Sequence, residues 1–203
     1  MVHALWFTDV QPREVRRHLG LPPDHGPQAW VDRLAEELSG RADVKLEIAS
    51  PGAKPYEPFT ASGIRYCDLP APLEQSRMRR VADGWRHRLS SPATLAAAGD
   101  LIRTVRPEVI HIHGTESAFG TVAVSSTATP CVISLQGLLQ QYQRLYFAGR
   151  TVGEMARLLA SAEFLKGRGE VHGYLGMRAM AGREAEVMRR GRYFIGRTDW
   201  DRA

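Results

Sequence analysis

The sequence predicts an α/β domain in which a doubly wound parallel sheet carries helices on both faces. Short apolar runs, typical of buried parallel strands, alternate along the chain with segments of helical character. Polar residues follow directly after several of these runs, as expected where parallel strands end at a ligand crevice. The alternation extends through all 203 residues, so we expect one domain over residues 1–203.

Six apolar runs, each bounded by polar residues, proline or glycine, are expected to form the strands. In chain order they are Ala4–Thr8, Val44–Ala49, Ile64–Leu69, Val109–Ile112, Pro130–Gln136 and Arg192–Gly196. The fourth run is the most informative, because it passes through His113 and Gly114 into a polar turn. Strand alternation places His111 and His113 on the same face, with His111 deeper in the sheet as a hydrogen-bonded core residue.

Six segments between the strands have helical features. In chain order they are Gln28–Leu38, Glu74–Leu89, Pro92–Val105, Ser117–Ser126, Val152–Leu165 and Tyr174–Arg190. The first carries an apolar face of Trp30, Leu34 and Leu38, the second is strongly basic, and the third begins with a proline. Prolines and glycines predict loops at Asp9–Pro27, with room for a short turn at Arg13–Leu19, and at Ser50–Gly63. Residues 138–173 are expected to be less regular before the last helix.

The composition limits the partners of this domain. Its net charge of +5 and pI of about 9.6 come largely from arginine, which suits phosphate and carboxylate groups. No nucleic-acid-binding signature accompanies the charge, so nucleic acid is not expected as a partner. Cys67 and Cys131 lie inside expected strands without metal or redox spacing, which predicts buried free thiols. No leader or membrane span is recognisable, so we expect a cytoplasmic protein, with contact to the inner membrane face left open.

Polar residues after four of the expected strands should meet at one edge of the sheet. Asp9 follows the first strand, Glu116 lies just beyond the fourth, Gln136 ends the fifth, and Arg197 and Asp199 follow the sixth. Ligands of open parallel sheets bind outside the carboxyl ends of the strands, so this edge is the predicted site.

Four segments in this order and spacing resemble the amino-terminal half of glycosyltransferase family 4: Gly26–Trp30, Arg106–Gly114, Thr129–Gly137 and Tyr193–Ala203. The resemblance implies one Rossmann-like half of a GT-B architecture, in a retaining glycosyltransferase of hexosyltransferase type. Such an enzyme transfers a sugar from a nucleotide-diphosphate sugar to a hydroxyl acceptor, here in bacterial polysaccharide or glycosylated-metabolite synthesis. This half would hold the acceptor. The donor-binding half is absent, so the chain alone is expected to be inactive, and no cofactor is expected.

The resemblance also assigns roles to single residues. Gly26 matches a glycine that approaches the donor diphosphate, although Pro27 replaces the usual second glycine and removes an N–H donor. His113 matches the catalytic histidine between the acceptor and the transferred sugar. Gln136 stands where the family often has histidine, and Arg197 and Asp199 match polar residues lining the cleft near the interdomain hinge.

Other readings stay open. The chain could be a non-catalytic α/β module that binds a phosphorylated small molecule or a partner protein. A third reading is a metal-dependent hydrolase that uses His111 and His113, which resemble a metal-binding pair; no further ligand spacing accompanies them, so no metal site is expected. An aromatic and basic cluster could grip an acceptor or lipid headgroup, or form a solvated lid; its members are Tyr142, Arg144, Tyr146, Phe147 and Arg150. Lys166–Glu170 is expected to be a turn rather than a phosphate loop, because no strand precedes it.

Overall fold

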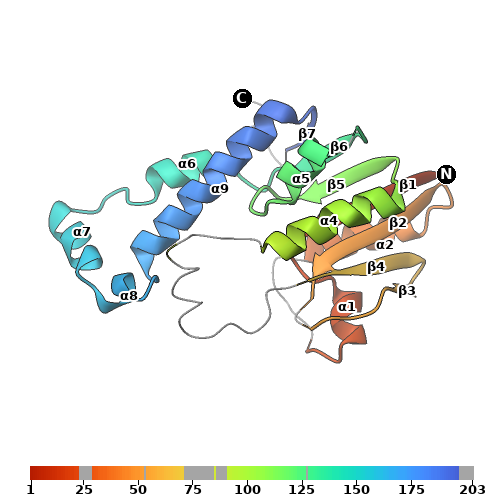
Figure 1. Cartoon of the computed structure of the whole chain (residues 1–203), viewed down its shortest axis with the longest axis horizontal. Helices are drawn as coiled ribbons and strands as arrows, with labels where there is room; N and C mark the ends of the chain where they lie inside the picture. The colour runs from red at the N-terminus through yellow and green to blue at the C-terminus, as the bar shows by residue number, and fades with distance from the viewer. Residues whose placement is uncertain (23–28, 53, 71–84, 86–90, 127, 197–203) are drawn as a thin grey trace.

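The computed structural model describes residues 1–22, 29–52, 54–70, 85, 91–126 and 128–196 (Figure 1). Within these residues the chain forms a seven-stranded sheet of order β3-β4-β2-β1-β5-β6-β7. All strand pairs are parallel except β3 with β4, and helices cover both faces. The predicted fold class, an α/β doubly wound sheet, is confirmed.

The six predicted strands are present, and a seventh was missed. Their bounds are β1 Val2–Thr8, β2 Val44–Pro51, β3 Phe59–Ala61, β4 Ile64–Leu69, β5 Val109–His113, β6 Cys131–Ser134 and β7 Tyr193–Ile195. Strand β3 lies in the stretch predicted as loop and pairs antiparallel with β4. The turn between them uses positive φ at Ser62 (49°) and Gly63 (77°), the geometry of a two-residue hairpin. Three residues are too short a run to give a strand pattern of their own.

The helices differ from expectation mainly after residue 138. Their bounds are α1 Arg13–His18, α2 Ala29–Ser39, α4 Pro92–Val105, α5 Phe119–Ser126, α6 Leu139–Leu145, α7 Val152–Leu159, α8 Ala162–Leu165 and α9 Glu170–Arg190. Helix α1 lies in the stretch predicted as a loop, where a short turn was expected. Helix α6 replaces an expected irregular stretch, and the single helix expected over residues 152–165 is two helices. The Ser161 side chain caps the second of them by accepting from Phe164 N. The expected helix Glu74–Leu89 lies outside the described residues, apart from Trp85.

Each face of the sheet has its own core. On one face, α1 and α2 cover Trp6, Ile48 and Tyr66. On the other, α4, α5 and α9 cover strand residues that include Phe7 and Ile112. Burying each such large apolar side chain contributes roughly 1.5–3 kcal/mol, so both helix layers are anchored to the sheet by the hydrophobic effect. None of the described helices has the length and apolarity needed to cross a membrane.

The strand order reverses its direction of growth between β1 and β5. From β1 the chain builds outward through β2 and β4, and it then returns to add β5, β6 and β7 on the other side. The register pairs Thr8, at the end of β1, with His113, at the end of β5. Such a reversal leaves a crevice beyond the carboxyl ends of the two central strands, where open α/β sheets bind ligands.

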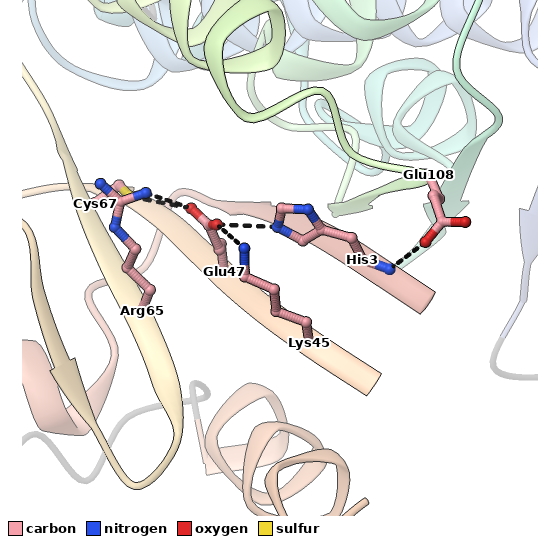
Figure 2. Close-up of polar contacts among 6 residues, drawn as sticks. All are labelled: His3, Lys45, Glu47, Arg65, Cys67 and Glu108. Carbon is pink, nitrogen blue, oxygen red and sulfur yellow. Dashed lines mark hydrogen bonds and ion pairs between the residues drawn. The ribbon is translucent and has the colours of Figure 1, made fainter. Parts of the chain in front are cut away.

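A buried carboxylate on β2 lies on the α4 face and is surrounded by basic groups (Figure 2). The Glu47 side chain is 2% exposed, and its oxygens lie 2.9 Å from His3 Nε2, 3.1 Å from Arg65 Nη1 and 3.5 Å from Lys45 Nζ. Cys67 Sγ lies 3.9 Å from the same carboxylate. Burial, more than this neighbour, raises the pKa of the Cys67 thiol to about 11, so the thiol stays protonated.

Both cysteines are free and buried, as predicted. Burial raises the pKa of Cys131 to about 12.

Candidate functional site

The loop after β5 brings two predicted site residues together. Gly114 has a φ of +94°, which turns the chain sharply at the end of the strand. A Cβ placed on Gly114 would collide with Glu116 Oε2 and lie 3.2 Å from Gln136 Nε2. The Glu116 carboxylate and the Gln136 amide therefore meet beside the Gly114 backbone, although they come from different strand ends.

His113, the predicted catalytic residue, immediately precedes Gly114, and its side chain is enclosed by rings. Its side chain is 4% exposed, and the ring centroids of His111, Trp6 and Trp30 are 4.0, 4.5 and 5.0 Å from its own. Neither imidazole nitrogen has a hydrogen-bond partner among the described residues. Burial, with a smaller contribution from His111, lowers the pKa of His113 to about 3, so the ring is neutral at physiological pH.

His111 is hydrogen-bonded, as predicted, but it is half-buried whereas His113 is buried, so the expectation that His111 lies deeper is wrong. Its Nε2 lies 2.7 Å from Ser134 Oγ on the neighbouring strand β6, and burial lowers its pKa to about 4. No group of three or more histidine, cysteine, aspartate or glutamate residues within the described part of the chain could hold a metal ion. His111 and His113 thus form a close pair of neutral imidazoles without a third ligand in that part of the chain.

Asp9, directly after β1, is one of the polar residues predicted at this edge, although no role was assigned to it. Desolvation of the carboxyl group by the surrounding side chains raises the pKa of Asp9 to about 6, although the residue as a whole is exposed. A hydrogen bond with the Ser117 side chain and the positive charge of Arg183 lower the pKa, whereas the Glu116 charge raises it.

Helix α9 supplies two further residues that the sequence analysis did not associate with this edge. Arg183 Nη2 donates to the backbone oxygen of Glu116 at 3.2 Å, and burial lowers the pKa of the guanidinium. Its neighbour Glu184 is fully buried and accepts from Thr115 Oγ1 at 2.7 Å. Both lie inside a helix almost seventy residues beyond the loop that they contact, so no local pattern marks them.

Three predicted site residues, Gly26, Arg197 and Asp199, lie outside the described residues.

The aromatic and basic cluster of residues 142–150 divides into two parts. The rings of Tyr146 and Phe147 pack on Tyr174 of α9, and their centroids lie 5.8 and 5.0 Å from the centroid of the Tyr174 ring. Tyr142 is 54% exposed and lies over Gly137, where an added Cβ would be 2.6 Å from its hydroxyl. Tyr142 is thus the member nearest to the loop that follows Gln136.

A hollow of about 440 Å³ lies at the opposite edge of the sheet. Its lining includes Cys131 at the amino end of β6, Arg192 just before β7, and Arg190 at the end of α9. The polar residues described above lie instead at the carboxyl ends, where the strand order predicts a ligand crevice. We therefore place the candidate site at the carboxyl edge.

The fold and this edge define a domain of Rossmann-like α/β type with a polar ligand site at its topological switch point. A family profile described as "Glycosyl transferase 4-like domain" matches residues 25–166, which is more than half of the chain. The chain therefore belongs to the glycosyl transferase 4-like family, and the resemblance found in the sequence is confirmed.

Comparison with solved structures gives one example of similarity. The chain is similar to sucrose-phosphate synthase (tll1590) from Thermosynechococcus elongatus, at 14% sequence identity and a TM-score of 0.47. The alignment covers 97% of this chain and 47% of that one, so the chain spans about half the length of this relative. A comparison with curated proteins finds no match.

Proposed function

We propose that this chain is the acceptor-binding, amino-terminal half of a GT-B glycosyltransferase. The enzyme would transfer a sugar, with retention of configuration, from a nucleotide-diphosphate sugar to a hydroxyl acceptor. A bacterial polysaccharide or a glycosylated metabolite would be the product. Membership of the glycosyl transferase 4-like family supports the class of reaction. The observation that carries the assignment of this half is the meeting of Glu116 and Gln136 beside Gly114, the residue after His113, at the carboxyl edge.

The chemistry of this edge suits the binding of hydroxyl groups. The carboxylates of Asp9 and Glu116 accept hydrogen bonds from hydroxyls, and the Gln136 amide both donates and accepts. Because the pKa of His113 is about 3, its imidazole is neutral and can orient a hydroxyl by a hydrogen bond. A neutral ring supplies no positive charge to a departing phosphate, so that task belongs to other groups in this proposal.

Contact between His113 and an acceptor requires movement of a side chain. Both ring nitrogens are buried, with Trp30 at the start of α2 on one side and Trp6 of β1 on another. Trp6 belongs to a central strand, whereas Trp30 lies on the first turn of a helix. We therefore propose that Trp30 is displaced when the acceptor binds.

The remaining assignments rest on the family resemblance. Gly26 would approach the donor diphosphate, and Arg197 and Asp199 would line the cleft toward the donor-binding half. The nucleotide-sugar would be held mainly by that second half, with no metal or cofactor. A cytoplasmic location, peripheral to the inner face of the membrane, would suit a basic domain of this kind.

Nucleotide release tests the proposed function. The protein that contains this chain together with its donor-binding half would be incubated with UDP-, GDP- and ADP-sugars, with and without hydroxyl acceptors. We expect release with one donor, enhanced by an acceptor. If a folded protein releases no nucleotide from any of these donors, the transferase assignment is refuted and a binding module is favoured. Calorimetry should detect no tight nucleotide-sugar binding to the present chain, and micromolar binding would contradict the proposed division between the halves.

Substitution of His113 tests the site in the same assay. We expect His113→Ala to lower kcat by about 10²–10³-fold, the range for loss of an orienting or hydrogen-bonding group in a transition state. His18→Ala is the matched control, because His18 is an exposed histidine that stacks on Phe59 of β3 at a ring distance of 4.0 Å. Near-normal turnover of His113→Ala would contradict the assigned role.

A further inference from the structure

We propose that Glu184 of α9 is a positioning residue, whose buried carboxylate holds the loop after β5 and the start of α6 in one arrangement. Its catalytic consequence rests on the proposed function, whereas its effect on local structure does not.

The geometry connects three separate elements through one carboxylate. Glu184 is 0% exposed, its Oε2 accepts from Thr115 Oγ1 at 2.7 Å, and its Oε1 accepts from Gln140 N at 3.3 Å. Thr115 lies between His113 and Glu116 in the loop after β5. Gln140 lies in the first turn of α6, four residues after Gln136. The two oxygens of a single side chain therefore bind the two segments that bring Glu116 and Gln136 together.

A carboxylate at this depth is costly unless donors satisfy it, because burial removes its contacts with water. Both donors seen here come from site segments rather than from the body of the sheet. Moving either segment would leave a buried oxygen without its partner, so the cost of burial keeps the two segments at a fixed separation.

The neighbouring Arg183 acts on the same loop. Its Nη2 donates to the Glu116 backbone oxygen at 3.2 Å, and its charge lowers the pKa of Asp9. Two successive residues of α9 thus contact successive residues of the loop. Glu184 binds Thr115 and Arg183 binds Glu116, so helix α9 helps to position the loop that carries the candidate site.

Three variants separate positioning from general stability. Thr115→Val removes one hydroxyl and keeps the side-chain shape. Glu184→Leu removes both hydrogen bonds. In Glu184→Gln one amide oxygen can still accept from Gln140 N while the amide group donates to Thr115 Oγ1, so this variant should rescue the function. Glu186→Gln is the matched control on the same helix, because Glu186 is 39% exposed and faces Arg190 at 3.5 Å.

Amide hydrogen exchange of the present chain is the first measurement. We expect exchange at residues 115–117 to rise about tenfold in Thr115→Val, and exchange at residues 115–117 and 140–141 to rise at least as much in Glu184→Leu. Strands β1 and β2 should exchange as in the unsubstituted chain, and Glu184→Gln and Glu186→Gln should change little. Unchanged exchange in both Thr115→Val and Glu184→Leu would overturn the proposal.

Turnover of the protein that contains both halves is the second measurement, made at a temperature where every variant is folded. We expect kcat to fall about tenfold in Thr115→Val and about a hundredfold in Glu184→Leu, with the donor KM unchanged and Glu184→Gln within about threefold. A lower melting temperature with normal kcat would show a purely structural residue and overturn the positioning role. If amide exchange rises as expected but the protein shows no transfer with any donor, the proposed function is refuted. The role of Glu184 in holding the loop after β5 and the start of α6 would then still be established.

Discussion

His113 should make the stability of this domain depend on pH below neutrality. Burial lowers its folded-state pKa from 6.5 to about 3, so the unfolded chain takes up a proton at a higher pH than the folded chain does. The stabilising contribution is therefore fully present above pH 6.5 and is lost as the pH falls toward 3. Between pH 7 and pH 5 this one residue should lower the free energy of unfolding by about 2 kcal/mol.

The comparison with His113→Phe isolates this effect from other titrating groups. Phenylalanine keeps an aromatic ring between Trp6 and Trp30 but cannot bind a proton. Urea unfolding of both proteins, measured by tryptophan fluorescence from pH 5 to pH 8.5, gives the free energy of unfolding at each pH. The original protein should lose about 2 kcal/mol more than the variant between pH 7 and pH 5.

The range above pH 7.5 serves as the internal control, because there the imidazole is neutral in both folded and unfolded chains. The two stability curves should run parallel in that range. Parallel curves that continue down to pH 5 would refute the argument, since they would show that His113 binds its proton equally well when folded.

Two further predictions concern the buried carboxylate and the turn after β5. Glu47→Ala should lower the free energy of unfolding by about 2–4 kcal/mol, because it leaves three basic groups without their shared partner. Lys45→Ala should lower it by less than about 1 kcal/mol, since Lys45 is half-exposed and lies 3.5 Å from the carboxylate. Equal losses for the two variants in urea unfolding would contradict this prediction. Gly114→Ala should lower the free energy of unfolding by about 1–3 kcal/mol more than Gly149→Ala does. Both glycines have positive φ, but only a Cβ at position 114 would collide with Glu116. Equal losses in thermal unfolding would mean that Glu116 moves aside freely.

Local patterns in the sequence were sufficient for most of the fold. The apolar runs located six strands, and β4 and α4 begin and end at the predicted residues. For α4 the reason is chemical, because Ser91 caps the helix by accepting from Thr94 N and Pro92 occupies its first position. Strand β3, helix α6 and the break at Ser161 were missed, and α1 was expected only as a turn, because short elements carry too few residues for a periodic pattern.

The candidate site was predicted in part. Residues that follow a strand, such as His113 and Glu116, were identified because a parallel sheet gathers the ends of its strands at one edge. The sequence could not show that His113 is enclosed by two tryptophans, because that depends on the register of β1 with β5 and on where α2 begins. It also could not associate Arg183 and Glu184 with this edge, because their contacts join segments far apart in the chain.

The sequence by itself determined six of the seven described strands and which polar residues stand at their ends, because both depend on neighbours within a few positions. Only the tertiary structure decided which of those residues meet, how deeply each is buried, and therefore which imidazoles are neutral. Burial and hydrogen bonding arise from contacts between distant segments, such as the hydrogen bond between Glu184 of α9 and Thr115 in the loop after β5.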